Sequence, residues 1–210
     1  VSCIFGLLCA MAVFGYLYNA RSSCAMHALP LRREGLFTTQ YLAGLSFGLL
    51  PHLAVALCTA AIEMVLLPPD AWLEALSCLG IWLLVQSATF LFFFSFAAFC
   101  AMFTGHLLAL PIFYAVFNAL AAALRWLLDY ALLSFYYGYS SNYEAGEAMA
   151  WLTPVLQLAR SVEPDDFWSS LGTVGIYALA GLVLTVGALL LYRRRNLETA
   201  GDVVAVRVMR

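Results

Sequence analysis

A run of 28 residues without one charged side chain, residues 75–102, reads ALSCLGIWLLVQSATFLFFFSFAAFCAM. A helix needs about 20 predominantly apolar residues to cross the hydrocarbon core of a bilayer. Strands of membrane barrels are only about 10 residues long and alternate apolar with polar side chains, which this run does not do. The run therefore predicts a membrane-spanning helix.

Similar apolar stretches recur along the chain, and five are long enough to span a membrane. To within a few residues, they lie at about 1–18, 41–67, 73–102, 107–133 and 171–192. The expected fold is all-α, a polytopic transmembrane helix bundle forming a single domain over 1–210. Because the chain starts within apolar sequence and without Met, we expect a sixth span before it in a longer protein.

The composition excludes several classes of protein. Apolar residues make up 64% of the chain and charged residues 10%, and the mean hydropathy is +0.91. A soluble domain carries about 25% charged residues, so these side chains are too few to coat a soluble enzyme or a nucleic-acid binder. The expected environment is the lipid bilayer. The six Cys residues lack metal-ligand spacing, so we expect packing roles and no metal site.

The arginines indicate the orientation of the spans. Eight of the ten Arg residues lie in three segments expected to be cytoplasmic, which are 19–40, 103–106 and 193–210. Of the segments expected to be extracellular, 68–72 holds no Arg and 134–170 holds only Arg160. The positive-inside rule then places the first three segments in the cytoplasm. We expect a multi-pass protein of the cell membrane. Within the second outer segment, 145–160 predicts a short amphipathic helix, interrupted by Pro154, at the outer interface.

Polar residues inside membrane spans are default functional candidates. Three lie at similar depth in different spans, namely His52, Gln86 and Asn118. They could share one polar seam, which would either fix the bundle or line a substrate path. Arg125 and Asp129 are four residues apart, which predicts an ion pair on one helix face. Glu63, at a similar depth in another span, could join that pair.

The pentapeptide Gly44-Leu45-Ser46-Phe47-Gly48 fits two patterns. As GxxxG, Gly44 and Gly48 would let two membrane helices approach closely. As GxSxG, Ser46 would be a nucleophile, but that motif needs a strand-to-helix turn. We therefore favour helix packing and expect no catalytic residue. A membrane-embedded enzyme, such as an intramembrane protease or a lipid-modifying protein, is the alternative function.

The segment between the first two spans contains HALPLRREGLF at 27–37 and QYLAGL at 40–45. Pro30 and the charged turn after it predict a short helix at the membrane surface that runs into the second span. These residues resemble the cytoplasmic segment of bacterial type-2 ATP-binding-cassette permeases, although Gln40 stands where many relatives have a basic residue. Two further stretches are similar to such permeases, YRRRNLETAG at 192–201 and LTPV at 152–155.

This resemblance implies the membrane subunit of an exporter of a Gram-positive type. Two such domains, as a homodimer or heterodimer, would enclose the substrate path, and a separate cytoplasmic ATPase subunit would bind ATP and magnesium. This chain would bind no cofactor itself. A coupling helix would dock on the ATPase, formed by Leu29, Pro30, Leu31, Arg32, Arg33, Glu34, Leu36 and Phe37. Leu31, Leu36 and Phe37 would be its apolar anchors, and Glu34 would pair with a neighbouring arginine.

The orientation is testable by labelling in intact cells. In a Cys-free background, a Ser141→Cys variant is expected to react with a membrane-impermeant thiol reagent, because 134–170 is expected outside. A Thr199→Cys variant is expected to react only after the cells are opened. The reverse pattern would contradict the predicted topology.

Overall fold

The computed structural model describes residues 1–28, 31–138, 151–160 and 167–194, and every regular element in these ranges is helical. Four of its helices are long and apolar enough to cross a membrane. They are α3 (Arg33–Leu66), α4 (Trp72–Phe103), α5 (Ala109–Phe135) and α8 (Phe167–Arg194). These helices fit a membrane protein, and each covers one of the expected spans.

The first expected span, 1–18, is helical from Ser2 to Tyr18. It consists of α1 (Ser2–Phe14), whose last turn tightens into a 3₁₀ helix, η1 (Gly15–Tyr18). Ala10 and Phe14 have no exposed surface, whereas Ile4, Phe5 and Leu8 are exposed, so α1 packs one face against the core and leaves its other apolar face outside it.

The segment that follows differs from the predicted helix at 29–37. A separate helix, α2 (Ala20–His27), is capped by the Asn19 side chain, which accepts a hydrogen bond of 3.0 Å from the Arg21 backbone N–H. Arg32 is extended, and α3 begins at Arg33 and continues without a break into the span. This start places Glu34 in the first turn, where the helix dipole favours an acid, and keeps Arg32 out of it.

Two of the long helices contain a proline, and the two prolines lie at different positions within them. Pro51 lies inside α3, which stays helical on both sides of it. Pro111 lies in the first turn of α5, where its missing N–H would have no partner within the helix in any case. Pro111 therefore removes no hydrogen bond from within α5.

The centre of the fold is the second half of α4. From Phe90 to Met102 almost every side chain of α4 is buried, on all sides of the helix. The helices packed around it are α8, α1 and α3. A helix that is apolar all round can be enclosed in this way, whereas an amphipathic helix would have to leave one polar face outside.

Gly44 and Gly48 bring α3 against α4. A Cβ atom at Gly44 would overlap the ring of Phe94, and one at Gly48 would overlap the ring of Phe90. The two rings are themselves stacked, with centroids 5.8 Å apart. The pentapeptide therefore packs helix against helix as GxxxG does, but aromatic rings, not a second glycine face, occupy the space.

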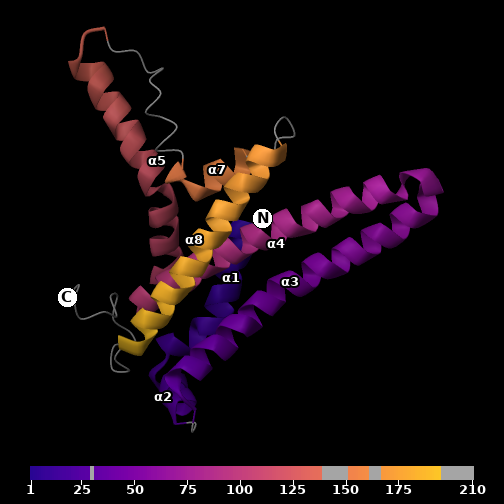
Figure 1. The fold of residues 1–210 in the computed structure, drawn as a ribbon. Coiled ribbons are helices and arrows are strands. Elements are labelled where there is room, and N and C mark those ends of the chain that lie inside the picture. The colour runs from indigo at the N-terminus through magenta and orange to yellow at the C-terminus, as the bar shows by residue number, and fades with distance from the viewer. Residues whose placement is uncertain (29–30, 139–150, 161–166, 195–210) are drawn as a thin grey trace.

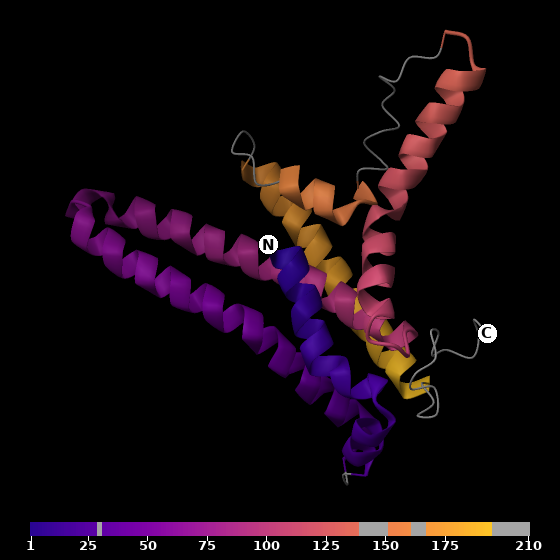
Figure 2. The ribbon, with the colours of Figure 1, turned by 180° about the vertical axis from the view of Figure 1, so that it is seen from behind.

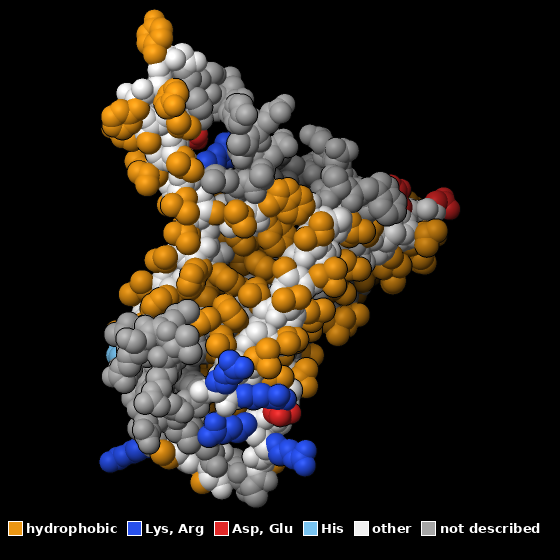
Figure 3. All heavy atoms as spheres, turned by 60° about the vertical axis from the view of Figure 1, so that its left-hand side comes forward, with side chains coloured by type: hydrophobic (Ala, Val, Ile, Leu, Met, Phe, Trp, Pro, Cys, Tyr) orange, Lys and Arg blue, Asp and Glu red, His pale blue; other side chains and the backbone are white. Residues whose placement is uncertain are grey.

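Successive long helices run in opposite directions, and they converge at one end (Figures 1 and 2). We call this end the base; it contains α2, the start of α3 and the end of α8. Away from the base, the α3–α4 hairpin and α5 diverge from α8 (Figures 1 and 2). Figure 3 shows that arginines gather at the base, while the arms expose mainly apolar side chains. The base arginines come from segments that the sequence assigns to one side of the membrane.

The outer connection between α5 and α8 contains α7 (Pro154–Arg160). Trp151 is helical, Leu152 and Thr153 are not, and Pro154 begins the next helix, so within the described residues the helix expected over 145–160 is interrupted at this proline. Residues 139–150 of the expected outer hairpin lie outside the described residues. The Tyr177 hydroxyl on α8 donates to the Trp151 carbonyl at 2.6 Å, and the rings of these two residues are stacked. This contact fixes the segment before α7 against α8.

Glycine-to-alanine variants test the packing of α3 on α4. Gly44→Ala and Gly48→Ala are each expected to lower the free energy of unfolding by about 1–3 kcal/mol, since the added methyl forces the rings aside. Gly80→Ala is the control, because a Cβ there meets nothing within 4 Å and helix propensity favours Ala by up to about 1 kcal/mol. Chemical denaturation in detergent micelles measures both effects. Equal stability of all three variants would contradict the close packing.

Candidate functional site

The residues expected to dock on an ATPase fall into an exposed group and a buried group. Leu31 is 62% exposed, and Arg32 and Arg33 beside it are also exposed. The buried members are Leu36 and Phe37, and two further members, Leu29 and Pro30, lie outside the described residues. The prediction that Leu36 and Phe37 are exposed anchors is therefore wrong, because both pack inside the chain.

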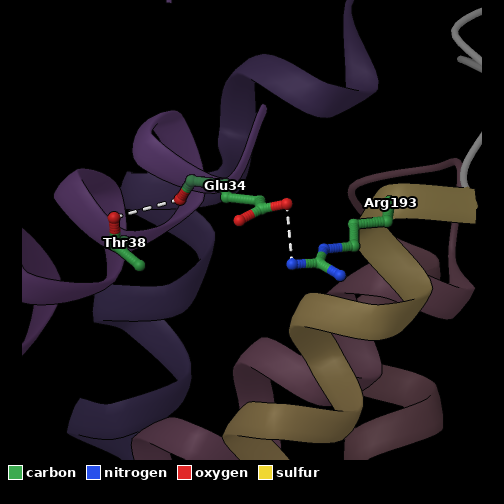
Figure 4. Close-up of polar contacts among 3 residues, drawn as sticks. All are labelled: Glu34, Thr38 and Arg193. Atoms are coloured by element: carbon green, nitrogen blue, oxygen red, sulfur yellow. Dashed lines mark hydrogen bonds and ion pairs between the residues drawn. The ribbon is translucent and has the colours of Figure 1, made fainter. Parts of the chain in front are cut away.

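Glu34 forms an ion pair with Arg193, whereas the sequence suggested a neighbouring arginine. The Glu34 Oε1 and Arg193 Nη2 atoms are 2.6 Å apart, and the side chains are 54% and 46% exposed. Figure 4 shows Arg193 reaching from α8 toward the first turn of α3, where Thr38 donates to the backbone carbonyl of Glu34 at 3.0 Å. An exposed pair contributes at most about 1 kcal/mol, so it chiefly aligns the two helix ends.

Below this pair, Phe37 lies at the centre of an aromatic cluster. Its ring centroid is 5.7 Å from that of Phe14, 5.9 Å from that of Tyr41 and 5.6 Å from that of Tyr192. The hydroxyls of Tyr192 and Tyr16 are 3.1 Å apart, so one can donate to the other. The cluster joins α1, η1, α3 and α8 at the base, and aromatic pairs at such distances add to the energy of burial.

A network of three hydroxyls lies one turn further along α3. Thr185 of α8 donates to the Tyr41 hydroxyl at 2.8 Å, and the Tyr41 and Ser95 oxygens are 2.6 Å apart. Ser95 of α4 donates to the Leu91 carbonyl at 2.6 Å. Because each hydroxyl has one proton, the order Thr185 to Tyr41 to Ser95 to Leu91 satisfies all of them. Three helices are thereby joined in an apolar interior.

The first two mid-span residues singled out by the sequence have separate surroundings. Gln86 Oε1 accepts a hydrogen bond of 3.2 Å from the Ser2 hydroxyl, which ties α4 to α1. His52 presents its ring edge-on to Trp82 and Phe90, with centroids 6.3 and 6.0 Å away, and its buried Nδ1 has no partner. No hydrogen bond connects these two residues.

The third residue, Asn118, is buried on α5. Its Nδ2 donates to the Tyr114 carbonyl of the same helix at 2.9 Å, and its Oδ1 has no partner. The Tyr114 hydroxyl in turn donates to the Cys3 carbonyl at 3.1 Å and so ties α5 to α1. His52, Gln86 and Asn118 therefore do not form the single polar seam that their depth suggested.

Arg125 and Asp129 lie close together, with Nε and Oδ2 3.8 Å apart, as their spacing on one helix predicts. Glu63 does not join them, because α3 and α5 diverge toward their outer ends (Figures 1 and 2). The buried Oε2 atom of Glu63 has no hydrogen-bond partner. Glu63 is therefore not part of the Arg125–Asp129 pair.

The geometry offers little for the hydrolase interpretation of Ser46. Its hydroxyl donates to the Ala43 carbonyl at 2.7 Å, the usual behaviour of serine inside a helix. Within 1–28, 31–138, 151–160 and 167–194, no three His, Cys, Asp or Glu side chains come together where a metal ion could be held. The hydrogen bonds, the ion pair and the ring contacts described above connect α1, α3, α4 and α8 to one another.

The hydroxyl network is testable by a double-mutant cycle on Tyr41→Phe and Thr185→Val. Interhelical hydrogen bonds in membranes contribute about 0.6 kcal/mol on average and up to about 1.7 kcal/mol, and we expect a coupling free energy in this range. Tyr130→Phe serves as the control, because that side chain is exposed near the outer end of α5. If the two substitutions change the free energy of unfolding additively, the hydrogen bond contributes no measurable coupling free energy, and this would contradict the prediction.

No family model, no curated protein and no solved structure matches the chain. The functional interpretation therefore rests on the residues, their arrangement and the sequence resemblance. The start of α3 is exposed and basic, and the Glu34–Arg193 ion pair connects it to the end of α8.

Proposed function

We propose that this chain is the membrane-spanning permease subunit of an ATP-binding-cassette exporter in a bacterial cell membrane. Its apolar helices and its resemblance to type-2 permeases at 27–45 and 192–201 support the proposal. The single observation that carries it is the continuity of α3. One helix runs from the exposed Arg33 at the base to Leu66 at the far tip.

A force applied at the start of α3 reaches the membrane span without crossing a loop. Leu31, Arg32 and Arg33 are exposed there, and they present one apolar and two cationic side chains to a partner. Such a combination suits a protein groove with an acidic rim, since a buried apolar anchor gives affinity and charges steer the approach. Leu36 and Phe37, which follow on α3, are buried and pack inside the helix bundle.

Under this proposal the chain is not itself an enzyme. A cytoplasmic ATPase subunit binds ATP and magnesium, and hydrolysis there moves the permease between states. A second permease domain completes the substrate path. Neither His52 nor Ser46 is placed for hydrolytic chemistry, so the membrane-embedded enzyme gains no support from the geometry.

The proposal is tested by co-purifying the full-length protein with the ATPase from its own host. The double variant Leu31→Ala, Arg32→Ala is expected to weaken the association about tenfold or more, since two anchors are lost. Leu42→Ala is the matched control, because Leu42 is 63% exposed on the same helix but lies further into the span. Affinity is measured with purified components in nanodiscs.

Two outcomes would contradict the proposal. If no ATPase accompanies the wild-type protein, the permease assignment fails. If the double variant and the Leu42→Ala control bind the ATPase equally well, the start of α3 is not the docking site. A loss of membrane insertion in an Arg32→Glu, Arg33→Glu variant, with unchanged ATPase binding, would instead indicate that these arginines only contact lipid headgroups.

A further inference from the structure

Three contacts join α3 to α8 at the base, and we call them the clasp. From the base inward they are the Glu34–Arg193 ion pair, the Phe37–Tyr192 ring contact and the Tyr41–Thr185 hydrogen bond. We propose that the clasp makes α3 and α8 move as one unit, so that a push on the start of α3 reaches the last span at the same moment. The proposal that a push is transmitted through α3 depends on the proposed function, whereas the three contacts of the clasp do not.

The spacing of the clasp residues shows that it is a continuous seam. Glu34, Phe37 and Tyr41 are three and four residues apart, so they lie on one face of α3. On α8 their partners come in the reverse order, as expected for antiparallel helices. The seam therefore has an ion pair at its exposed end and buried contacts behind it, with Tyr192 1% exposed.

The helix dipoles favour the same pairing. Glu34 lies in the first turn of α3, where the helix end is positive, and Arg193 lies in the last turn of α8, where it is negative. Each charge is therefore stabilised by its own helix before the two meet. Antiparallel packing brings these ends together, and the ion pair adds to an attraction that the backbone already supplies.

The clasp extends over only part of α3. The buried residues of α3 between its start and the proline are Leu36, Phe37, Tyr41, Gly44 and Gly48, and beyond them only Ala56 is buried. Past this region α3 runs beside α4 and away from α8 (Figures 1 and 2). The linked unit is therefore the base, while the hairpin arm stays free to change its angle.

The clasp is tested without an ATPase by spin labels at Leu42→Cys and Leu190→Cys, two exposed positions on α3 and α8, in the otherwise Cys-free full-length protein. Electron paramagnetic resonance gives the distribution of distances between the labels. Glu34→Gln is expected to raise the population with separated helix ends about twofold to fivefold, the factor expected for an exposed ion pair. The charge exchange Glu34→Arg, Arg193→Glu is expected to restore only part of the original distribution, because the two charges can pair again but each then opposes the dipole of its own helix.

Arg194→Gln is the matched control, because it removes the same charge one residue away from the pair. It is expected to leave the distribution unchanged. If Glu34→Gln behaves like this control, the ion pair does not hold the helices together and the clasp is refuted.

The coupled motion is tested with the ATPase bound. A Glu34→Cys, Arg193→Cys variant bridged by a short bifunctional thiol reagent is expected to transport as well as the unbridged variant, since the two helices do not need to separate. Loss of transport on bridging, with ATPase binding intact, would overturn the one-unit proposal while leaving the permease assignment in place. If no variant binds an ATPase, the proposed function fails, and the label distances still decide whether the clasp exists.

Discussion

The rings of Phe90 and Phe94 lie directly on Gly48 and Gly44, and the position of the other base contacts depends on this close approach. Apolar helices gain little from the hydrophobic effect when lipid surrounds them, so close packing and hydrogen bonds must hold them together. A larger side chain at either glycine would move α3 away from α4. Tyr41 would then lose its place beside Ser95, and the hydroxyl connection to α8 would be lost with it.

The long helices could be predicted from the sequence because each contains an apolar stretch long enough to cross a bilayer. The expected span 73–102 became Trp72–Phe103, and 107–133 became Ala109–Phe135. Hydropathy measures how apolar a segment is, and it does not show which face of α1 packs against α4 and α3 and which face stays exposed.

The site was predictable only where the chemistry is local. Arg125 and Asp129 are neighbours on one helix, so their spacing was sufficient. Glu34 and Arg193 lie in different helices at nearly opposite ends of the chain, and no periodicity reveals which helices meet. Phe37 shows a second limit of prediction from the sequence. An apolar residue near the start of a helix can pack in a partner's groove or in the protein's own core, and the sequence alone does not distinguish the two.

The free part of the α3–α4 hairpin has a mechanical consequence. From Leu49 to Leu66, α3 extends beyond the base for 18 residues, a lever of about 27 Å. A rotation of about 10° where α3 leaves the base would displace the tip of such a lever by about 5 Å. A small change in packing around Gly48 would thus be amplified into a movement comparable to one helical turn at the opposite end of the molecule.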